Sequence, residues 1–379
     1  MAGLDRRSVM RWYAPALPVL ACGVAALACA LPSGEVGSIQ TSVAATLTSD
    51  AAAVPTDTAT PEPTPTPSPL PPRLWKSYSS GGDTGWWLEN GTATEVTLPV
   101  EPGQYYDYNS VNGKILYASH FATTGAGPSN LAASDLWMVD YPSGTPTALI
   151  PTDTVVEALW SPDGSGFVYI GATPATYELR FRSLAGEDRL LAVNVSPTWS
   201  VSPTGAAAAF TRETGYDLPG APGLFVVSTA GGPETMVSSA DRHGAGSIDD
   251  RPIWTVDGSF LAMPNYGFAP PTLVIAAADG SLDANLSYAP DVTDDPTVGS
   301  APTAVLWHPD GQHLVAITNY SESMGGPSPV FLFELGADRH TVVSATPLGL
   351  GIGLVDWNVP GHSFFILDEN ANVALVNVP

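Results

Sequence analysis

The sequence predicts an all-β fold made of a repeated unit of four short strands. A tryptophan closes an apolar strand and a tight turn follows it in five places, at residues 160–164, 199–205, 254–258, 307–311 and 357–361. A degenerate sixth copy lies at 108–113. Repeated units of this kind bury their faces only against neighbouring units. The pattern therefore predicts a β-propeller of four-stranded antiparallel blades over residues 73–379.

The segments between these turns have the same order of strands in each repeat. After Gly164, runs of apolar or alternating residues predict strands at 167–170, 177–181 and 189–193. The same three strands follow Gly258 and Gly311. Together with the strand that ends in tryptophan, each repeat predicts an antiparallel meander of four strands.

The residues of the tight turns have a structural explanation. Proline presets φ at the second turn position, aspartate hydrogen-bonds locally, and glycine accepts the positive φ that closes the hairpin. We therefore expect Asp163, Asp257 and Asp310 to form turns rather than to catalyse or to bind metal. The large ring at the end of each inner strand is expected to wedge between neighbouring sheets.

The two ends of the repeat region decide the number of blades. Residues 74–78, 85–88 and 94–98 predict three strands without an inner first strand, whereas 363–367 and 373–377 follow their turn without an outer last strand. Five complete and two incomplete units predict seven blades of about 44 residues each, an ordinary blade size. In the alternative, the N-terminal strands complete the C-terminal blade and the ring has six blades.

The turn signature resembles that of TolB-like, or WD40-like, propeller repeats. Residues 160–164 match it fully and 307–311 nearly so, while Trp199 lies two residues too early in its copy. The resemblance implies the propeller architecture and a binding face formed by the longer connections. TolB itself has an α/β domain before its propeller, where this chain has a proline-rich segment. The resemblance therefore does not imply a role in the same envelope machine.

The N-terminal segment predicts export. Arg6, Arg7 and Arg11 precede an apolar run at 12–28, so residues 1–28 read as a signal peptide that is removed rather than as a membrane span. Cys29 then stands where bacterial lipoproteins carry the lipid-bearing cysteine. Cys22 is an alternative, and so is a secretory signal whose cysteines are discarded. Because the chain has only these 2 cysteines, the mature body is expected to lack disulfides and thiolate metal sites.

Residues 29–72 predict a lipid-attachment cysteine followed by a disordered stalk. Alanine, serine and threonine dominate its first half, and proline and threonine dominate residues 54–72. Proline fixes φ and removes a donor, so the second half should be an extended, semi-rigid tether. With residues 39–48, this segment resembles surface lipoproteins of filamentous green non-sulfur bacteria. The resemblance implies a lipid-anchored protein at the outer face of the cell membrane, and the alternative is a secreted protein.

The charge of the chain bears on its partners. The formal net charge is −24, with 13 lysines and arginines against 37 acidic residues. Nucleic-acid binding requires cations that neutralise phosphates, so nucleic acid is not an expected partner. The acidity is expected to keep an exported surface soluble. No cofactor is evident from the sequence, and we expect the protein to act as a monomer.

The familiar catalytic motifs are missing from the sequence. It contains no Gly-x-Ser-x-Gly elbow, no His-Glu-x-x-His and no phosphate-binding Gly-x-x-x-x-Gly-Lys. The histidines are scattered, which leaves metal binding open; they are residues 120, 243, 308, 313, 340 and 362. The sequence favours a binding or protein–protein interaction module. The alternative is a glycan-cleaving lyase or hydrolase that uses carboxylates on the loop face.

Long connections on one face of the ring supply the candidate site. In a propeller the connections after the second and fourth strands of each blade share a face, and here they are the long ones, for example 238–252 and 319–329. Long loops on a rigid scaffold are where function concentrates. The candidate ligand-binding residues are Arg212, Asp217, Asp250, Arg251, Tyr266 and Tyr320. They suit a cell-envelope or extracellular protein, peptide or glycan, and their oxygens would also suit calcium.

Overall fold

The computed structural model describes residues 69–77, 84–100, 105–119, 133–212, 221–239, 251–265, 272–292, 302–318, 327–368, 370 and 372–379. The chain divides into two compact units, Met1–Pro63 and Thr64–Pro379, and all described residues belong to the second. Within these ranges the regular elements are strands, and no helix is long and apolar enough to cross a membrane. The predicted signal peptide, Cys22, Cys29 and the stalk up to residue 68 lie outside the described residues.

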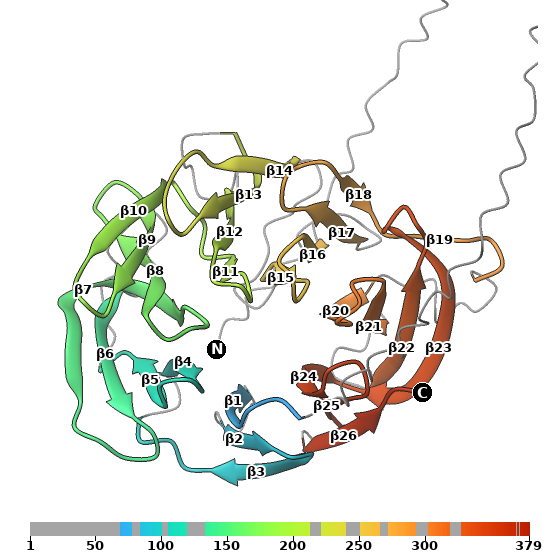
Figure 1. Ribbon diagram of the computed structural model, residues 1–379, viewed down its shortest axis with the longest axis horizontal. Helices are drawn as coiled ribbons and strands as arrows, with labels where there is room; N and C mark the ends of the chain where they lie inside the picture. The colour runs from blue at the N-terminus through green and yellow to red at the C-terminus, as the bar shows by residue number, and fades with distance from the viewer. Residues whose placement is uncertain are drawn as a thin grey trace, which may run out of the picture. The chain divides into compact units, whose positions relative to one another are not determined.

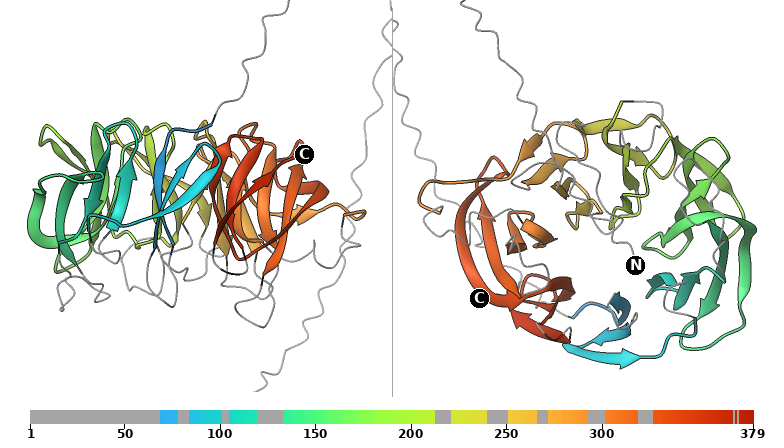
Figure 2. Two further views of the ribbon diagram at one scale, coloured as in Figure 1. Left: turned by 90° about the horizontal axis from the view of Figure 1, so that it is seen from below. Right: turned by 180° about the vertical axis from the view of Figure 1, so that it is seen from behind.

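The described strands form six hydrogen-bonded sheets that stand side by side in a ring around a central opening (Figure 1). Seen from the side in Figure 2, the strands run from one face of the ring towards the other. Neighbouring strands within these sheets are antiparallel, with a single parallel pair formed by β19 and β23 among the pairings described. The predicted all-β propeller is confirmed.

The first two sheets contain ten strands, each sheet in chain order. The first holds β1 (Arg73–Ser77), β2 (Thr84–Glu89) and β3 (Thr92–Val96). The second holds β4 (Tyr105–Asn109), β5 (Lys114–Tyr117), β6 (Ser134–Asp140), β7 (Thr147–Trp160), β8 (Gly166–Ala172), β9 (Tyr177–Ser183) and β10 (Asp188–Val193).

The remaining four sheets complete the ring. Two have four strands each, namely β11 (Trp199–Val201), β12 (Ala207–Arg212), β13 (Gly223–Ser228) and β14 (Thr235–Ser239), then β15 (Ile253–Trp254), β16 (Phe260–Asn265), β17 (Thr272–Ala277) and β18 (Asp283–Asn285). The fifth holds β19 (Ser287–Tyr288), β20 (Pro302–Trp307), β21 (His313–Thr318), β22 (Ser328–Leu335) and β23 (Thr341–Gly351). The last holds β24 (Gly353–Val359), β25 (Ser363–Leu367) and β26 (Val373–Asn377).

Strand β7 explains the width of the second sheet. Its N-terminal half pairs with β6, where Ile150 lies opposite Leu136, and its C-terminal half pairs with β8, where Trp160 lies opposite Phe167. Between the two halves Asp153 adopts a φ of 51°, and the pairing with β6 is irregular there. The sheet therefore consists of two antiparallel meanders that share β7.

Three of the tryptophans that end the inner strands connect their sheet to the one before it, whereas the indole N–H of Trp160 has no hydrogen-bond partner among the described residues. The indole Nε1 of Trp357 donates to the carbonyl oxygen of Trp307 at 2.9 Å, and Trp307 donates likewise to Ile253 at 2.9 Å. Trp254 donates to the hydroxyl of Ser200 at 3.0 Å. These three rings are buried between sheets, and each of their indole N–H groups finds an acceptor there, as buried polar groups require. The predicted structural role of the tryptophans is confirmed.

The tight turns have the geometry that their sequence predicts. Gly164 has a φ of 69°, a conformation that favours glycine. The carboxylate of Asp163 accepts the backbone N–H of Ser165 at 3.0 Å, and that of Asp310 accepts the backbone N–H of Gln312 at 2.7 Å. The aspartates thus stabilise the turns locally, as expected.

The hydrophobic core lies between the sheets. In one cluster, Val168 and Ile170 of β8 are buried with Phe210 of β12 and Phe225 of β13. The last and first sheets meet in the same way, because Leu88 of β2 is buried with Val355 and Phe365 of the last sheet. Each sheet is thus stabilised by its neighbours, which is the basis of a closed ring.

Polar contacts reinforce the junction of the last sheet with the first. The backbone oxygen of Asn358 accepts the N–H of Leu70 at 2.8 Å, and its side-chain oxygen accepts the N–H of Gly91 at 2.7 Å. Arg73 Nε lies 2.6 Å from a carboxylate oxygen of Asp356. β3 and β26 belong to different sheets, so this junction rests on side-chain packing and these contacts rather than on a shared strand.

Candidate functional site

Most of the residues predicted to bind a ligand lie outside the described residues. These are Asp217, Asp250, Tyr266 and Tyr320. The structure places the other two, Arg212 and Arg251, in different surroundings. They do not contact each other through any hydrogen bond or ion pair found among the described residues.

Arg212 is the last residue of β12 rather than part of a loop, and it is 9% exposed. Its guanidinium donates to both carboxylate oxygens of Glu234, at 2.8 and 2.7 Å, and to the carbonyl of Val193 at 3.0 Å. It also lies 4.5 Å from the ring centroid of Phe225. A bidentate pair that stacks on an aromatic ring fixes a guanidinium firmly. The contacts of Arg212 are those of a structural residue.

Arg251 takes part in a cluster at the inner strands. It precedes β15 and forms an ion pair with Glu157 of β7, whose side chain is 13% exposed. The second oxygen of Glu157 accepts the indole N–H of Trp199 at 2.8 Å. One carboxylate therefore joins residues of three sheets or their adjoining segments.

Asp107 of β4 belongs to the same region and has an unusual ionisation. Its carboxylate accepts the backbone N–H groups of Trp160 and Tyr108, both at 2.8 Å. Burial raises the pKa of this carboxyl to about 6, although both hydrogen bonds and the charge of Arg251 lower it. The group is positioned by backbone donors on both oxygens, which is the arrangement of a structural link between β4 and β7.

A pocket of about 440 Å³ opens on the second sheet, between the first half of β7 and the strands β8 to β10. Its polar lining comes mainly from β8, β9 and β10, namely Tyr169, Thr173, Glu178, Arg180, Arg182 and Asp188. The segment of β7 that bends around Asp153 contributes the opposite wall, including Ile150 and Thr154. A concavity of this size suits a small molecule or a segment of a larger one.

Strand alternation explains why the charged side chains gather in this pocket. In β9, Glu178, Arg180 and Arg182 are spaced two residues apart and share one face, while Tyr177 and Leu179 on the other face are fully buried. Across the ladder, Arg180 lies opposite Tyr169 and Arg182 opposite Asp188. Neighbours on one face of paired strands are close enough to interact.

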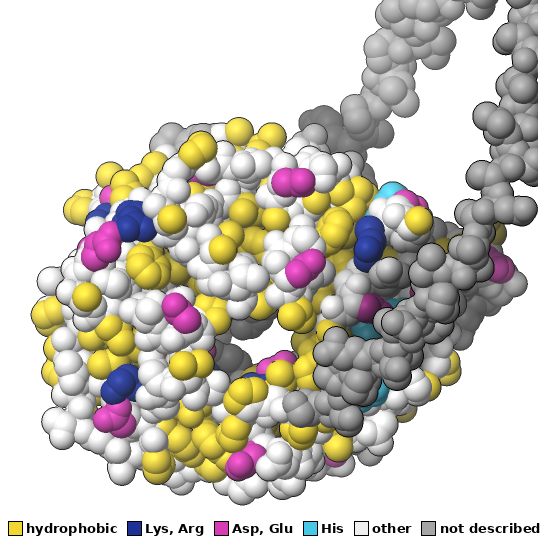
Figure 3. Space-filling view, viewed as in Figure 1, with side chains coloured by type: hydrophobic (Ala, Val, Ile, Leu, Met, Phe, Trp, Pro, Cys, Tyr) yellow, Lys and Arg dark blue, Asp and Glu magenta, His cyan; other side chains and the backbone are white. Residues whose placement is uncertain are grey.

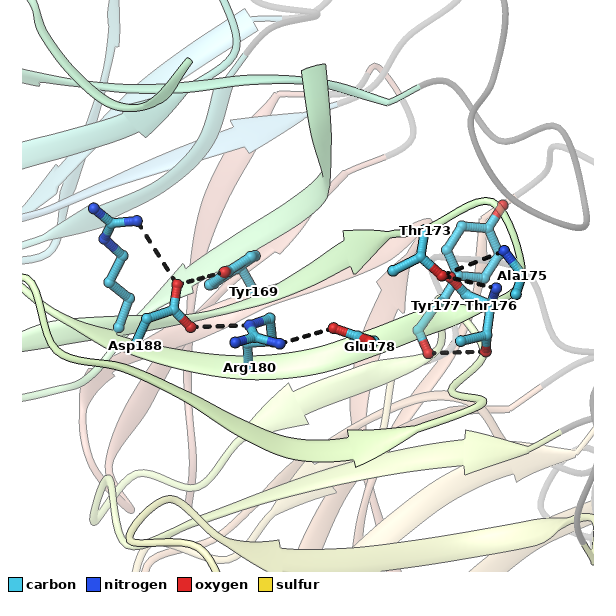
Figure 4. A network of polar contacts seen from close by, with 9 residues as sticks. Tyr169, Thr173, Ala175, Thr176, Tyr177, Glu178, Arg180 and Asp188 are labelled. Atoms are coloured by element: carbon cyan, nitrogen blue, oxygen red, sulfur yellow. Dashed lines mark hydrogen bonds and ion pairs between the residues drawn. The ribbon is translucent and has the colours of Figure 1, made fainter. Parts of the chain in front are cut away.

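Four side chains of the pocket form a continuous chain of hydrogen bonds, namely Tyr169, Asp188, Arg180 and Glu178 (Figure 4). The phenol of Tyr169 donates to one oxygen of Asp188 at 2.8 Å, and Nε of Arg180 donates to the other at 2.9 Å. Arg180 also donates to Glu178 at 2.8 Å. Arg182 reaches Asp188 only at 3.7 Å. Burial, together with the bond to Asp188, raises the pKa of Tyr169, so the phenol remains a donor at neutral pH.

The floor of the pocket includes a residue without a side chain. Gly171 of β8 lies opposite Glu178. A Cβ built there would lie 3.4 Å from a ring carbon of Tyr169 and 3.7 Å from Cδ of Arg180, which are ordinary contacts. A larger side chain at this position would fit the backbone and occupy the pocket.

The sequence carries a signal for this pocket outside the long loops. The strand at 177–181 was expected, and its charges alternate with buried residues, which marks one polar face. The wall supplied by β7 could not be expected, because it requires one strand to serve two meanders. Figure 3 shows that charged side chains are scattered over the viewed face, so no single charged patch marks a site there.

One group of side chains among the described residues could hold a metal ion. It consists of His308, Asp310 and His313, at the turn between β20 and β21. This turn belongs to a different sheet from the pocket. The aspartate was expected to form a turn, which it does, and the histidines beside it were not expected to meet.

Comparisons with known proteins give resemblances of fold. No protein-family model and no curated protein matches the sequence. Among solved structures, TolB from Acinetobacter baumannii is 12% identical, with a TM-score of 0.41 over 80% of this chain and 78% of that one. Hydrazine synthase of Kuenenia stuttgartiensis is 14% identical, with a TM-score of 0.49 over 85% and 98%. An oligogalacturonate lyase from Vibrio parahaemolyticus is 12% identical, with a TM-score of 0.49 over 81% and 86%. At these scores the resemblances assign neither activity nor ligand.

Proposed function

We propose that this protein is a lipid-anchored propeller that binds a polar ligand, a peptide or glycan of the cell envelope, in the pocket between β7 and β10. The observation that carries the proposal is the pocket itself, about 440 Å³ with its charged side chains fixed by one another. Donors and acceptors that are already oriented lose little freedom when they bind a ligand. Such a lining suits a ligand that has both donors and acceptors.

Arg182 is the residue of this network best placed to contact a ligand. Its one ionic contact among the described residues is the 3.7 Å approach to Asp188, and its side chain is 30% exposed. A guanidinium carries five N–H donors in a planar fork that suits carboxylates. A carboxylate on the bound peptide or glycan would therefore pair with Arg182, while Tyr169 and Arg180 hold Asp188 in place.

Binding can be tested with muropeptides, which contain both a peptide and a glycan, by isothermal titration calorimetry. Arg182→Ala removes the proposed ligand contact, and Gly171→Leu fills the pocket. We expect Arg182→Ala to weaken binding at least about tenfold, through the loss of roughly one charged hydrogen bond. Gly171→Leu should weaken it by occupying the space of the ligand. Arg189→Ala is the matched control, because Arg189 lies in the same strand as Asp188 but outside the lining.

The outcomes separate the two functions. Equal affinity of the wild type, Arg182→Ala and Gly171→Leu would move the site away from this pocket. Cleaved muropeptides in the mass spectrum after incubation would favour the glycan-active alternative. That alternative needs two carboxylates that reach a substrate, whereas the two that line this pocket, Glu178 and Asp188, both accept hydrogen bonds from Arg180.

The proposal includes the number of blades and the anchor. Counting the two meanders that share β7 separately gives seven blades, with three described strands in the first and last sheets. The anchor rests on the basic start, the apolar run and Cys29. Cys29→Ser should move the protein from the membrane fraction to the medium, whereas Cys22→Ser should not. Membrane retention of the Cys29→Ser variant would count against the anchor at this position.

A further inference from the structure

Three side chains from one turn converge at the tight-turn face of the fifth sheet. Nδ1 of His308 lies 3.0 Å from one oxygen of Asp310, and Nδ1 of His313 lies 2.7 Å from the other. Their potential ligand atoms all lie within 4.8 Å of one another. Ligands around a zinc ion, at bond lengths of about 2.0–2.1 Å, are themselves about 3.3 Å apart in a tetrahedron. The group is thus already close to the spacing of a metal site.

The neighbouring sheet fixes the orientation of His308. Its Nε2 lies 3.3 Å from the carbonyl oxygen of Gly361, and its ring packs edge-on against Trp357 with centroids 5.6 Å apart. A carbonyl can only accept, so Nε2 donates this bond, while Nδ1 accepts the backbone N–H of Asp310 at 3.3 Å and lies 3.0 Å from its carboxylate. A backbone carbonyl in this place is the usual outer partner of a metal-binding histidine. A cation that lies between Nδ1 and the carboxylate oxygen, which are 3.0 Å apart, would bind to both atoms.

Asp310 is also held in one orientation. One oxygen accepts the N–H groups of Gln312 and His313, at 2.7 and 3.1 Å, which leaves the other directed at the imidazole of His313.

The other repeats provide an internal comparison. In the equivalent turns, the residue after the tryptophan is Ser161 or Thr255, and the third residue after the aspartate is Gly166 or Phe260. These turns close with the same aspartate–backbone bonds and without any histidine. The imidazoles of His308 and His313 are therefore not needed to form the turn.

We propose that His308, Asp310 and His313 bind a divalent transition-metal ion of the zinc class. Two imidazole nitrogens and one carboxylate suit ions that accept nitrogen ligands, rather than calcium, which prefers oxygen. Solvent completes the coordination, because all three side chains are partly exposed. Through Gly361 and Trp357, the bound ion holds the turn of the fifth sheet against the last sheet. The site is independent of the pocket on the second sheet.

The test uses untagged full-length protein dialysed against a chelator and then titrated with zinc chloride. We expect one zinc ion to bind with a rise in melting temperature, and cobalt in its place to give the visible absorption of a site with nitrogen and oxygen ligands. His308→Ser introduces the residue that the turn of Ser161 has at this place, and His313→Phe introduces the one that the turn of Phe260 has. Each substitution should weaken zinc binding by at least about tenfold, the lower end of the effect of changing an outer-sphere partner.

His340→Ser is the matched control. His340 lies in the neighbouring turn of the same sheet, with Asp338 3.7 Å away and no second histidine in the group. This variant should bind zinc as the wild type does. Acidification should release the metal, since protons compete for the imidazoles. The absence of zinc binding by the wild type, or equal binding by the wild type, His308→Ser and His313→Phe, would overturn the site. Unchanged melting temperatures of the metal-free variants would show that the turn still folds.

Discussion

The indole of Trp199 donates its N–H to the carboxylate of Glu157, 2.8 Å away, across the boundary between the second and third sheets. Trp199 lies two residues earlier in its repeat than the other tryptophans. It therefore lies opposite Phe210 in the middle of β12, whereas Trp160 lies opposite Phe167 near the start of β8. The same carboxylate of Glu157 also pairs with Arg251.

Removal of this acceptor should destabilise the ring. Glu157→Ala leaves the buried indole N–H and the guanidinium of Arg251 without this partner, so the free energy of unfolding should fall by about 1–3 kcal/mol. Urea unfolding measures the change. Glu187→Ala is the control, because Glu187 is 60% exposed in its pair with Arg189 and exposed pairs contribute about 0–1 kcal/mol. Equal losses in both variants would contradict a special role for Glu157.

Arg212→Ala should also lower stability rather than only ligand binding. The substitution leaves Glu234 without its bidentate partner and removes the cation stacked on Phe225. A hydrogen bond to a charged group contributes about 1.5–3 kcal/mol, and the loss should appear as a lower urea midpoint. Arg189→Ala, which removes an arginine with a 35% exposed side chain, should change the midpoint less. A stable Arg212→Ala variant would return this residue to the list of ligand contacts.

The raised pKa of Asp107, about 6, predicts a pH dependence of defined sign. In the unfolded chain the carboxyl has its ordinary pKa of about 4, so between about pH 4 and pH 6 the native state binds the proton more tightly. Stabilisation from this proton is fully present below pH 4 and is lost as the pH rises through about 6. Asp107→Asn should remove this stabilisation. The contribution of Asp107 is then the difference between the free energies of unfolding of the wild type and the variant, followed between about pH 4 and pH 6.

Asp163→Asn is the matched control for the pH experiment. The backbone and side chain of Ser165, with Ser161, lower the pKa of Asp163, so its stabilisation is present above about pH 4 and is lost only as the pH falls further. The difference in the free energy of unfolding between Asp163→Asn and the wild type should therefore stay constant between about pH 4 and pH 6. A similar constant difference for Asp107→Asn would show that Asp107 has an ordinary pKa.

The junction of the last and first sheets should contribute to the stability of the whole ring. Asn358→Ala removes the acceptor of the Gly91 N–H and a donor to Ser363, so a loss of about 1–3 kcal/mol is expected. Circular dichroism and tryptophan fluorescence should still report a single coincident transition. Asn285→Ala, at an exposed position of β18, should have an effect within about 0.5 kcal/mol. Two separate transitions in Asn358→Ala would indicate that the end sheets unfold independently.

The sequence was sufficient for the features that repeat. The tryptophans, the glycine of each turn and the order of strands are dictated by local chemistry that recurs, and the structure confirms them at Gly164 and Trp357. The shift of Trp199 was also visible. These features depend on neighbours a few residues away, which a sequence shows directly.

The candidate sites depend on contacts between distant residues, and these were harder to predict. Arg212 was assigned to a loop because β12 extends further than its apolar run, and its partner Glu234 is 22 residues away. The pocket requires β7 to reach over β8 and β9. His308 and His313 become neighbours only because the turn between β20 and β21 folds them onto one carboxylate.

The sharing of β7 by two meanders limits how this ring can change in length. At most other described boundaries, neighbouring inner and outer strands belong to separate sheets, so a whole repeat can be duplicated or deleted with its own hydrogen bonds intact. The exception is β19, which follows β18 of the fourth sheet and pairs with β23 of the fifth. At β7 a cut between Ile150 and Val155 would leave one meander without its last strand or the next without its first. The two repeats joined there must be inherited, circularly permuted or transplanted as a pair.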